Sequence, residues 1–180
     1  PEWLRTRLAS IGQKSINNIV DAANFVLMDT GHPMHTFDLS KIKSKEINVR
    51  FAESGEKITT LDDVERELKD YHLLICDGKT PVALGGIMGG ANSVIDDATT
   101  DILIESAYFK PTVIRKGAKR FDLSTEASKR FERDTDIEAV IPALAQLSAL
   151  IQEVAGGDIL GGIIDNYPTK KNSQCVDFSI

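Results

Sequence analysis

The residues best able to do chemistry in this 180-residue chain lie between positions 81 and 109. Glu105 follows a β-rich run at residues 102–104, and we expect it at or near the carboxyl end of a strand. Upstream, a short apolar run leads into a loop in which the backbone can adopt positive φ and approach a ligand closely. That loop has four glycines in six positions: Gly85, Gly86, Gly89 and Gly90. A carboxylate beside exposed backbone amides predicts a polar spot in a pocket.

Two familiar phosphate-binding readings do not fit this glycine loop. It lacks the Lys-Ser/Thr ending of a P-loop, which argues against an ATPase. Gly86-x-x-Gly89 is also not a full dinucleotide fingerprint inside a strand-helix-strand unit. Without other evidence, simple tight turns joining packed strands are the competing interpretation.

Two histidines, His32 and His35, lie three residues apart around Pro33. Because proline pushes the preceding residue out of the helical region, we expect residues 31–38 to form a loop. The pair lacks the shared helix face of a zinc motif and has no third ligand nearby, so no metal site is predicted. His35 fits a hydrogen-bonding or proton-handling group near a cleft, with a structural role as the alternative.

Composition is that of an ordinary globular protein, with 42% hydrophobic and 27% charged residues. The length suits one compact domain over residues 1–180. No run of eighteen apolar residues and no signal peptide is present, which predicts a soluble protein. Cys76 and Cys175 form neither a metal spacing nor a disulfide framework, which favours a reducing, cytoplasmic setting. The abrupt start suggests a fragment of a longer chain.

The net charge of −6 argues against a protein that coats nucleic acid indiscriminately. Residues 115–133 are locally basic, which allows a positive face. The alternative is a solvated helix with interleaved opposite charges. The segment holds seven bases (Arg115, Lys116, Lys119, Arg120, Lys129, Arg130, Arg133) and three acids (Asp122, Glu126, Glu132).

Periodicity places these residues on an α+β fold: a mixed or antiparallel β core with flanking helices. Helices are predicted at residues 1–11, 16–30, 111–120 and 137–154, with a further short helix capped by Ser124. Residues 47–84 alternate as a β meander with hairpin turns, and further strands are predicted at residues 159–164 and 174–180. The second helix carries a polar stripe that could border a site, made of Asn17, Asn18, Asp21 and Asn24.

Five motifs in one order resemble a known family. They are Asn17-Asn18-x-Val20-Asp21, His32-Pro33-x-His35-x-Phe37-Asp38, Gly86-Ile87-x-Gly89-Gly90, Glu105-Ser106-Ala107 and Thr125-x-Ala127-Ser128-x-Arg130-Phe131-Glu132-Arg133. Together they resemble the editing module, the third and fourth structural modules, of bacterial phenylalanyl-tRNA synthetase beta subunits. The resemblance covers nearly the whole chain.

The resemblance implies hydrolysis of tyrosine wrongly esterified to the phenylalanine tRNA. It assigns catalytic roles to His35, Glu105 and Thr125, and substrate contacts to Gly89, Ala127 and Lys14. Asn24, from the polar stripe of the second helix, is a further candidate for substrate binding. Lys14 stands where relatives usually carry arginine, so charge is kept without the bidentate fork. Asp134 stands where a glycine is usual. Ligation, with ATP and Mg²⁺, is expected only in the alpha subunit, and this chain is expected to need neither cofactor nor metal.

The residues give this chemistry a physical basis. A hydrophobic synthetic pocket only weakly rejects an analogue that adds a hydroxyl, so a second site that requires the hydroxyl is useful. Glu105 and a backbone amide near Gly89 could bind that hydroxyl. His35 could position or deprotonate a water, although a hydroxyl of the terminal adenosine could also assist.

The expected partners are the tRNA acceptor end, the tyrosine moiety, the alpha subunit and the rest of the beta chain, without membrane or DNA. A module of the same fold that docks tRNA or protein without catalysis is the main alternative. A stand-alone relative acting on a free amino acid or peptide is a third.

Overall fold

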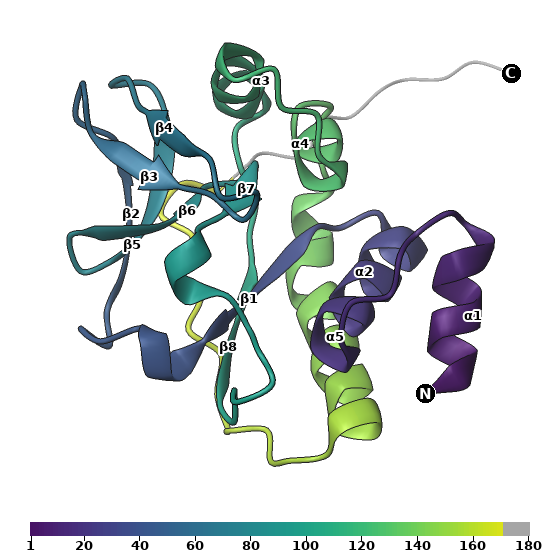
Figure 1. Cartoon of the computed structure of the whole chain (residues 1–180). Coiled ribbons are helices and arrows are strands. Elements are labelled where there is room, and N and C mark those ends of the chain that lie inside the picture. Colours follow the sequence, from purple (N-terminus) through teal and green to yellow (C-terminus); the bar gives the residue numbers. More distant parts are fainter. Residues whose placement is uncertain (171–180) are drawn as a thin grey trace, which may run out of the picture.

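A two-stranded ribbon divides the molecule into a helical half and a sheet half (Figure 1). The ribbon pairs β1 (Met34–Asp38) with β8 (Ile102–Ser106) in antiparallel register. The computed structural model describes residues 1–170. Its helices and antiparallel sheets confirm the predicted α+β class.

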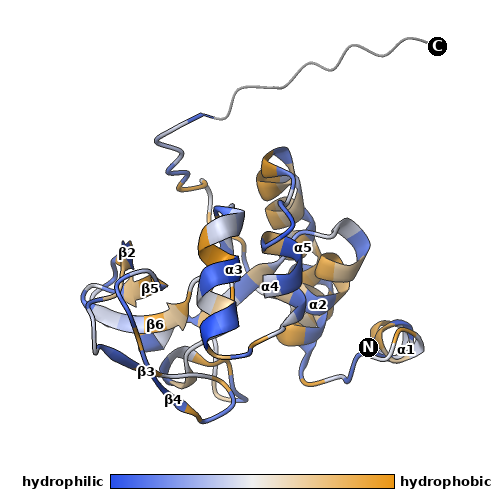
Figure 2. Cartoon of the chain, turned by 90° about the horizontal axis from the view of Figure 1, so that it is seen from above, coloured by the Kyte–Doolittle hydropathy of each residue, from blue (hydrophilic) through white to orange (hydrophobic). Residues whose placement is uncertain are grey.

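The helical half contains α1 (Glu2–Ser10), α2 (Asn18–Thr30) and α5 (Val140–Ala155). α2 begins where the Asn17 side chain accepts a hydrogen bond from the Val20 amide, and it ends at Gly31, whose φ of 76° suits glycine. α1 lies at the edge of the molecule beside α2 (Figures 1 and 2). The predicted helices at residues 1–11, 16–30 and 137–154 are confirmed to within a few residues.

Small residues let α5 pack closely on α2. Their shared core consists of Ala22, Ala23, Val26, Ala143, Leu147, Leu150 and Ile151. Within the described residues, the helical stretch Ile137–Ala155 is the one segment long and apolar enough to cross a membrane by length and composition. The same composition is expected of a helix that packs its apolar face into a protein core.

Alternation along the ribbon sends successive side chains to different cores. Met34 of β1, with Ile102 and Ile104 of β8, packs against the α2–α5 core. Phe37 and Leu103 point to the opposite side and join the core of the sheet half. The prediction of a loop through residues 31–38 was therefore wrong. Pro33 ends the preceding turn, but the period-two pattern after it makes a strand that gains partners from β8.

The sheet half contains the predicted antiparallel strands and hairpin turns, but they do not form one meander, because β2 (Ile47–Phe51) pairs with β5 (Leu73–Asp77) and the two strands between them form a separate hairpin. The main sheet has the order β2, β5, β6 (Thr80–Leu84) and β7 (Met88–Gly89). The hairpin of β3 (Lys57–Thr59) and β4 (Glu65–Glu67) lies above it in Figure 1. An isolated bridge between Thr60 and Gly90 joins this hairpin to the glycine loop.

Two further helices, α3 (Pro111–Arg120) and α4 (Glu126–Phe131), pack against each other beside the sheet. α3 begins at Pro111 as predicted. α4 is capped by Thr125 and not by Ser124, because Thr125 forms a capping box with Ser128.

The C-terminal part departs from the sequence prediction. No strand forms at residues 159–164, where Gly162 has a φ of 96° and the four isoleucine and leucine side chains are exposed. The glycine pair breaks the apolar run, and no partner strand faces it within residues 1–170. The strand predicted at residues 174–180 lies outside the described residues.

Candidate functional site

The centre of the candidate site is a pair of titratable side chains on the ribbon. His35 of β1 is directly opposite Glu105 of β8 in the antiparallel register, so both side chains point to the same face. The ring of Phe37, one step along on that face, meets the His35 ring edge to face at 4.5 Å between centroids. Glu105 is the fourth of five residues in β8, near its carboxyl end as predicted.

The glycine loop lies against the His35 member of this pair. A Cβ atom added at Gly89 would lie 2.6 Å from His35 Cε1 and 2.9 Å from His35 Nε2, so the imidazole rests directly on the glycine backbone. The same Cβ would lie 3.0 Å from a methyl group of Leu61. Leu61 also donates its amide proton to the Gly89 carbonyl at 3.0 Å. Any residue other than glycine here must displace the imidazole or the loop.

Burial disfavours the charged form of both titratable groups. It lowers the pKa of His35 to about 4, so the imidazole is unprotonated at neutral pH. It raises the pKa of Glu105 to about 7, so the carboxyl group carries a proton about half of the time there. Glu105 Oε2 is buried without a hydrogen-bond partner. A buried carboxyl oxygen of this kind is costly unless a ligand pairs with it.

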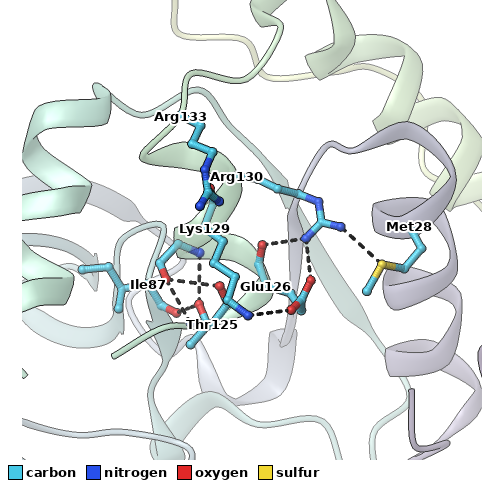
Figure 3. A network of polar contacts seen from close by, with 8 residues as sticks. Met28, Ile87, Thr125, Glu126, Lys129, Arg130 and Arg133 are labelled. Atoms are coloured by element: carbon cyan, nitrogen blue, oxygen red, sulfur yellow. Dashed lines mark hydrogen bonds and ion pairs between the residues drawn. The ribbon is translucent and has the colours of Figure 1, made fainter. Parts of the chain in front are cut away.

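Thr125 joins α4 to the glycine loop (Figure 3). Its hydroxyl donates to the Ile87 carbonyl at 2.8 Å and accepts from the Ser128 amide at 3.0 Å. Because its proton is already used, this hydroxyl can offer a substrate only an acceptor. Ala127 follows in the first turn of α4 and packs on the core of the sheet half.

The charges of α4 are largely neutralised within the helix (Figure 3). Glu126 binds Lys129 at 3.1 Å and Arg130 at 2.7 Å, and Arg130 also reaches the sulfur of Met28 on α2 at 3.3 Å. Arg133 donates to the Lys129 carbonyl at 2.9 Å. This half of the basic segment therefore matches the alternative of interleaved opposite charges.

The structure does not tie two of the predicted contacts to the His35–Glu105 pair. Lys14 is exposed in the connection between α1 and α2, and Asn24 is half-buried on α2. Within residues 1–170, neither side chain forms a hydrogen bond or an ion pair. Two other members of the polar stripe serve the fold instead: Asn17 caps α2, and buried Asp21 accepts from the Ser15 hydroxyl and the Ile16 amide.

Asp134 stands in a turn where the family resemblance implied a glycine. Its φ of 75° lies in the left-handed region, which aspartate tolerates better than most residues. Its carboxylate accepts a hydrogen bond from the Tyr108 hydroxyl at 2.8 Å. The turn that leads from α4 towards α5 is therefore preserved.

The remaining candidates fit structural roles. His32 is buried with both ring nitrogens unpaired, and its ring meets Phe131 edge to face at 6.4 Å. Among residues 1–170, no three His, Cys, Asp or Glu side chains gather as a metal site. Two surface hollows of about 380 Å³ lie elsewhere, one against Lys57 and Pro81 and one against Arg5 and Asn18.

Sequence reasoning missed two neighbours of the pair. Phe37 could have been found, because it stands two residues after His35 and so must share its face once the segment is a strand. Leu61 carried no signal, because only the fold brings the tip of the β3–β4 hairpin to Gly89.

Comparison with known proteins gives one consistent result. The B3/4 domain family matches residues 1–156. A phenylalanine–tRNA ligase beta subunit of Geobacter sulfurreducens is 51% identical over 180 residues, which is 100% of this chain and 22% of that protein. The corresponding subunit of Syntrophotalea carbinolica is 51% identical over 168 residues, covering 93% of this chain and 21% of the relative. That of Geobacillus kaustophilus is 46% identical over 180 residues, covering 100% of this chain and 22% of the relative. The chain thus spans about a fifth of these curated relatives.

Proposed function

The chain belongs to the B3/4 domain family, and from this we propose that it is the editing module of a phenylalanine–tRNA ligase beta subunit, which hydrolyses tyrosine esterified to tRNA(Phe). The observation that carries the proposal is the pairing of His35 with Glu105 on one strand face, against the backbone of Gly89. Both residues are half-buried and have no ion-pair partner among the described residues, as expected where a ligand supplies the missing contacts.

Selection of tyrosine rests on the unpaired oxygen of Glu105. The phenolic hydroxyl both donates and accepts, so it pairs with the carboxyl group whether that group is protonated or ionised. Phenylalanine leaves the buried oxygen unpaired, which costs about 1 to 3 kcal/mol. The site therefore binds the tyrosyl ester, which the synthetic pocket rejects only weakly.

Hydrolysis requires an oriented water and a stabilised oxyanion. A neutral His35 can accept a proton from that water throughout the physiological range, because its pKa is about 4. The low pKa also makes it a weak base, which favours a positioning role shared with a hydroxyl of the terminal adenosine. Thr125 fixes the start of α4 against the glycine loop and acts as a positioning residue.

In the parent enzyme, the proposed partners are the tRNA acceptor end, the alpha subunit and the rest of the beta chain, in the cytoplasm. Ligation with ATP and Mg²⁺ belongs to the alpha subunit in this proposal. The hydrolytic step described above uses only the side chains of this chain and water. Lys14 and Asn24 remain proposed contacts to the tRNA end, reached from the α1–α2 side.

The test is deacylation of preformed tyrosyl-tRNA(Phe) and phenylalanyl-tRNA(Phe) by the assembled parent ligase. We expect the tyrosyl ester to be hydrolysed faster, and Glu105→Ala, which removes both carboxyl oxygens, to reduce this preference roughly tenfold to a hundredfold. His35→Ala should slow hydrolysis of the tyrosyl ester while leaving aminoacylation unchanged. Glu67→Ala is the control, because Glu67 is exposed and bonds only to Lys69 among the described residues.

Equal hydrolysis of both esters, or a preference unchanged by Glu105→Ala, would contradict the proposed sieve. Loss of all hydrolysis in the wild type, with tRNA binding retained, would instead identify a docking module without catalysis. Titration of this chain with free tyrosine and free phenylalanine, followed by NMR, gives a second readout. Shifts near Gly89 should appear with tyrosine and be much weaker with phenylalanine.

A further inference from the structure

α3 has two faces of different chemistry (Figure 2). Its inner face holds Ile114, Gly117 and Ala118, all buried. A Cβ added at Gly86 would lie 2.9 Å from an Ile114 methyl group, and one added at Gly117 would lie 3.0 Å from an Ile87 methyl group. The helix is therefore pressed onto the same glycine loop that carries Gly89. Its position relative to the candidate site is fixed by packing.

The outer face of α3 is cationic and carries no acid. It is formed by the exposed residues Thr112, Arg115, Lys116, Lys119 and Arg120. Residues four apart on a helix are neighbours, so the four cations form two adjacent rows. Arg115 is engaged structurally, because it donates to the Glu132 carbonyl at 2.7 Å and so ties α3 to α4.

The other three cations have no carboxylate partner within 4.0 Å in the part of the chain that the structure describes. Lys116 lies over the Tyr71 ring at 3.9 Å from its centroid, and Arg120 lies over the Phe121 ring at 5.8 Å. These rings hold the cations in place without neutralising them. Glu67 is close enough to Arg120 for that charge to help lower its pKa, but Glu67 is paired with Lys69.

The cations of α3 differ from those of α4 in having no carboxylate partner in the described part of the chain. Both helices belong to one basic segment, yet Glu126 forms ion pairs with both cations of α4, whereas α3 contains no acid. Unpaired cations clustered on a rigid helix, in a chain of net charge −6, form a local site for an anionic partner.

This inference rests on the proposed function. We infer that Lys116, Lys119 and Arg120, on the outer face of α3, bind phosphates of the single-stranded acceptor end of the tRNA while its terminal ester occupies the candidate site. The helix is docked on the glycine loop, so contacts to the backbone a few nucleotides away would fix where the ester enters. Phosphate contacts of this kind position a nucleic acid without reading its sequence.

The test uses the assembled parent ligase with the triple variant Lys116→Gln, Lys119→Gln, Arg120→Gln. Two substrates are compared: tyrosyl-tRNA(Phe), and tyrosyl-adenosine, which has the ester but no phosphate. We expect KM for the tRNA ester to rise roughly tenfold with kcat nearly unchanged, and the dependence of log KM on log salt to become shallower by about 2. Hydrolysis of tyrosyl-adenosine should not change.

The matched control removes three exposed lysines from the far end of the sheet half: Lys43→Gln, Lys45→Gln and Lys79→Gln. It makes the same change in net charge, and we expect KM and salt dependence to stay at wild-type values. The single variant Lys119→Gln guards against misfolding, because Lys119 is exposed and contributes nothing to the core.

Three results would overturn the inference: an unchanged KM in the triple variant, an equal rise in the control variant, or an equal loss with both substrates, which would indicate a distorted loop. A wild type inactive on tyrosyl-adenosine and on the tRNA ester would overturn the proposed function itself. The two failures are therefore distinguishable.

Discussion

The molecule treats buried charge in two opposite ways within a short distance. In the β3–β4 hairpin, Arg66 is almost fully buried and its guanidinium binds both oxygens of Asp62, at 2.7 and 2.8 Å, and the Thr60 hydroxyl. These bonds hold the pKa of Asp62 well below its ordinary value. On the ribbon, His35 and Glu105 have no such partners among the described residues. Burial lowers the pKa of His35 and raises that of Glu105, so the uncharged form of each side chain is favoured.

The paired charges of the hairpin stabilise the fold, whereas we propose that the unpaired His35 and Glu105 bind a ligand. Arg66 organises the hairpin tip, where Leu61 donates to the Gly89 carbonyl and Thr60 bridges Gly90. The satisfied network therefore fixes the loop on which the unsatisfied His35 rests. Unpaired buried groups are tolerated on the ribbon because the structure around them is rigid.

Gly89→Ala is expected to disturb the candidate site most, because Gly89 lies against the His35 ring. The new methyl group would lie 2.6 Å from His35 Cε1, so the imidazole must move. A misplacement of about 1 Å at a reacting centre can cost on the order of 10²-fold, and we expect a loss of that size in hydrolysis of the tyrosyl ester. Single-turnover deacylation by the parent ligase measures it.

Gly85→Ala in the same loop is the matched control. Its added methyl would lie at ordinary contact distance, 3.4 Å from the Leu73 carbonyl, and its φ is not positive. We expect deacylation near the wild-type rate. An equal loss in both variants would mean that the loop, and not the seat of His35, had been damaged.

A second variant tests whether the hydrogen-bond network around Arg66 positions the candidate site. Arg66→Met keeps the aliphatic stem but removes the fork that holds Asp62 and Thr60. Loosening the hairpin tip should slow deacylation roughly tenfold, through the contact of Leu61 with Gly89. Rates are compared with those of Lys57→Met, which removes an exposed ion pair with Glu65 in the same hairpin and should have almost no effect. If the two variants match, the network does not position the site.

Much of the fold was predictable because its signals are local. Gly31 ends α2, Pro111 begins α3, and hairpin turns join neighbouring strands of the sheet half, as the sequence indicated. The errors occurred where long-range pairing decides. β1 is a strand because it pairs with β8, in which Glu105, the partner of His35, lies 70 residues further along the chain. The apolar run at residues 159–164 has no partner strand within residues 1–170.

The sequence named candidate residues for the site but did not show how they are arranged. Residue types and the family resemblance named His35, Gly89, Glu105 and Thr125, and the structure links them through the glycine loop and the ribbon. Sequence could not reveal that the Thr125 proton is already used, or that the basic segment divides into a neutralised helix and an unpaired one. Both facts depend on side-chain contacts across elements.

The smallest expected effect is a change in folding stability with pH, and its sign should differ between a buried unpaired carboxyl group and a paired one. Burial places the pKa of Glu105 at about 7, above its ordinary 4.5, so ionisation in the folded state costs stability as pH rises from 4.5 through 7. Glu105→Gln removes that cost. Relative to the wild type, the variant should therefore be more stable at pH 8 than at pH 5. Urea unfolding of this chain at both pH values measures the difference.

Glu56 should show the opposite behaviour. Its two bonds to Arg50, at 2.7 and 2.9 Å, lower its pKa, so its contribution is present above 4.5 and is lost as pH falls through the folded value. Glu56→Gln should cost about 1 kcal/mol at pH 8, and the cost should shrink towards pH 3.5. Titration of His35 is common to the wild type and both variants, so it cancels in each difference. Equal signs for the two glutamates would show that Glu105 is paired in solution, and the distinction between a structural and a ligand-binding carboxylate would fail.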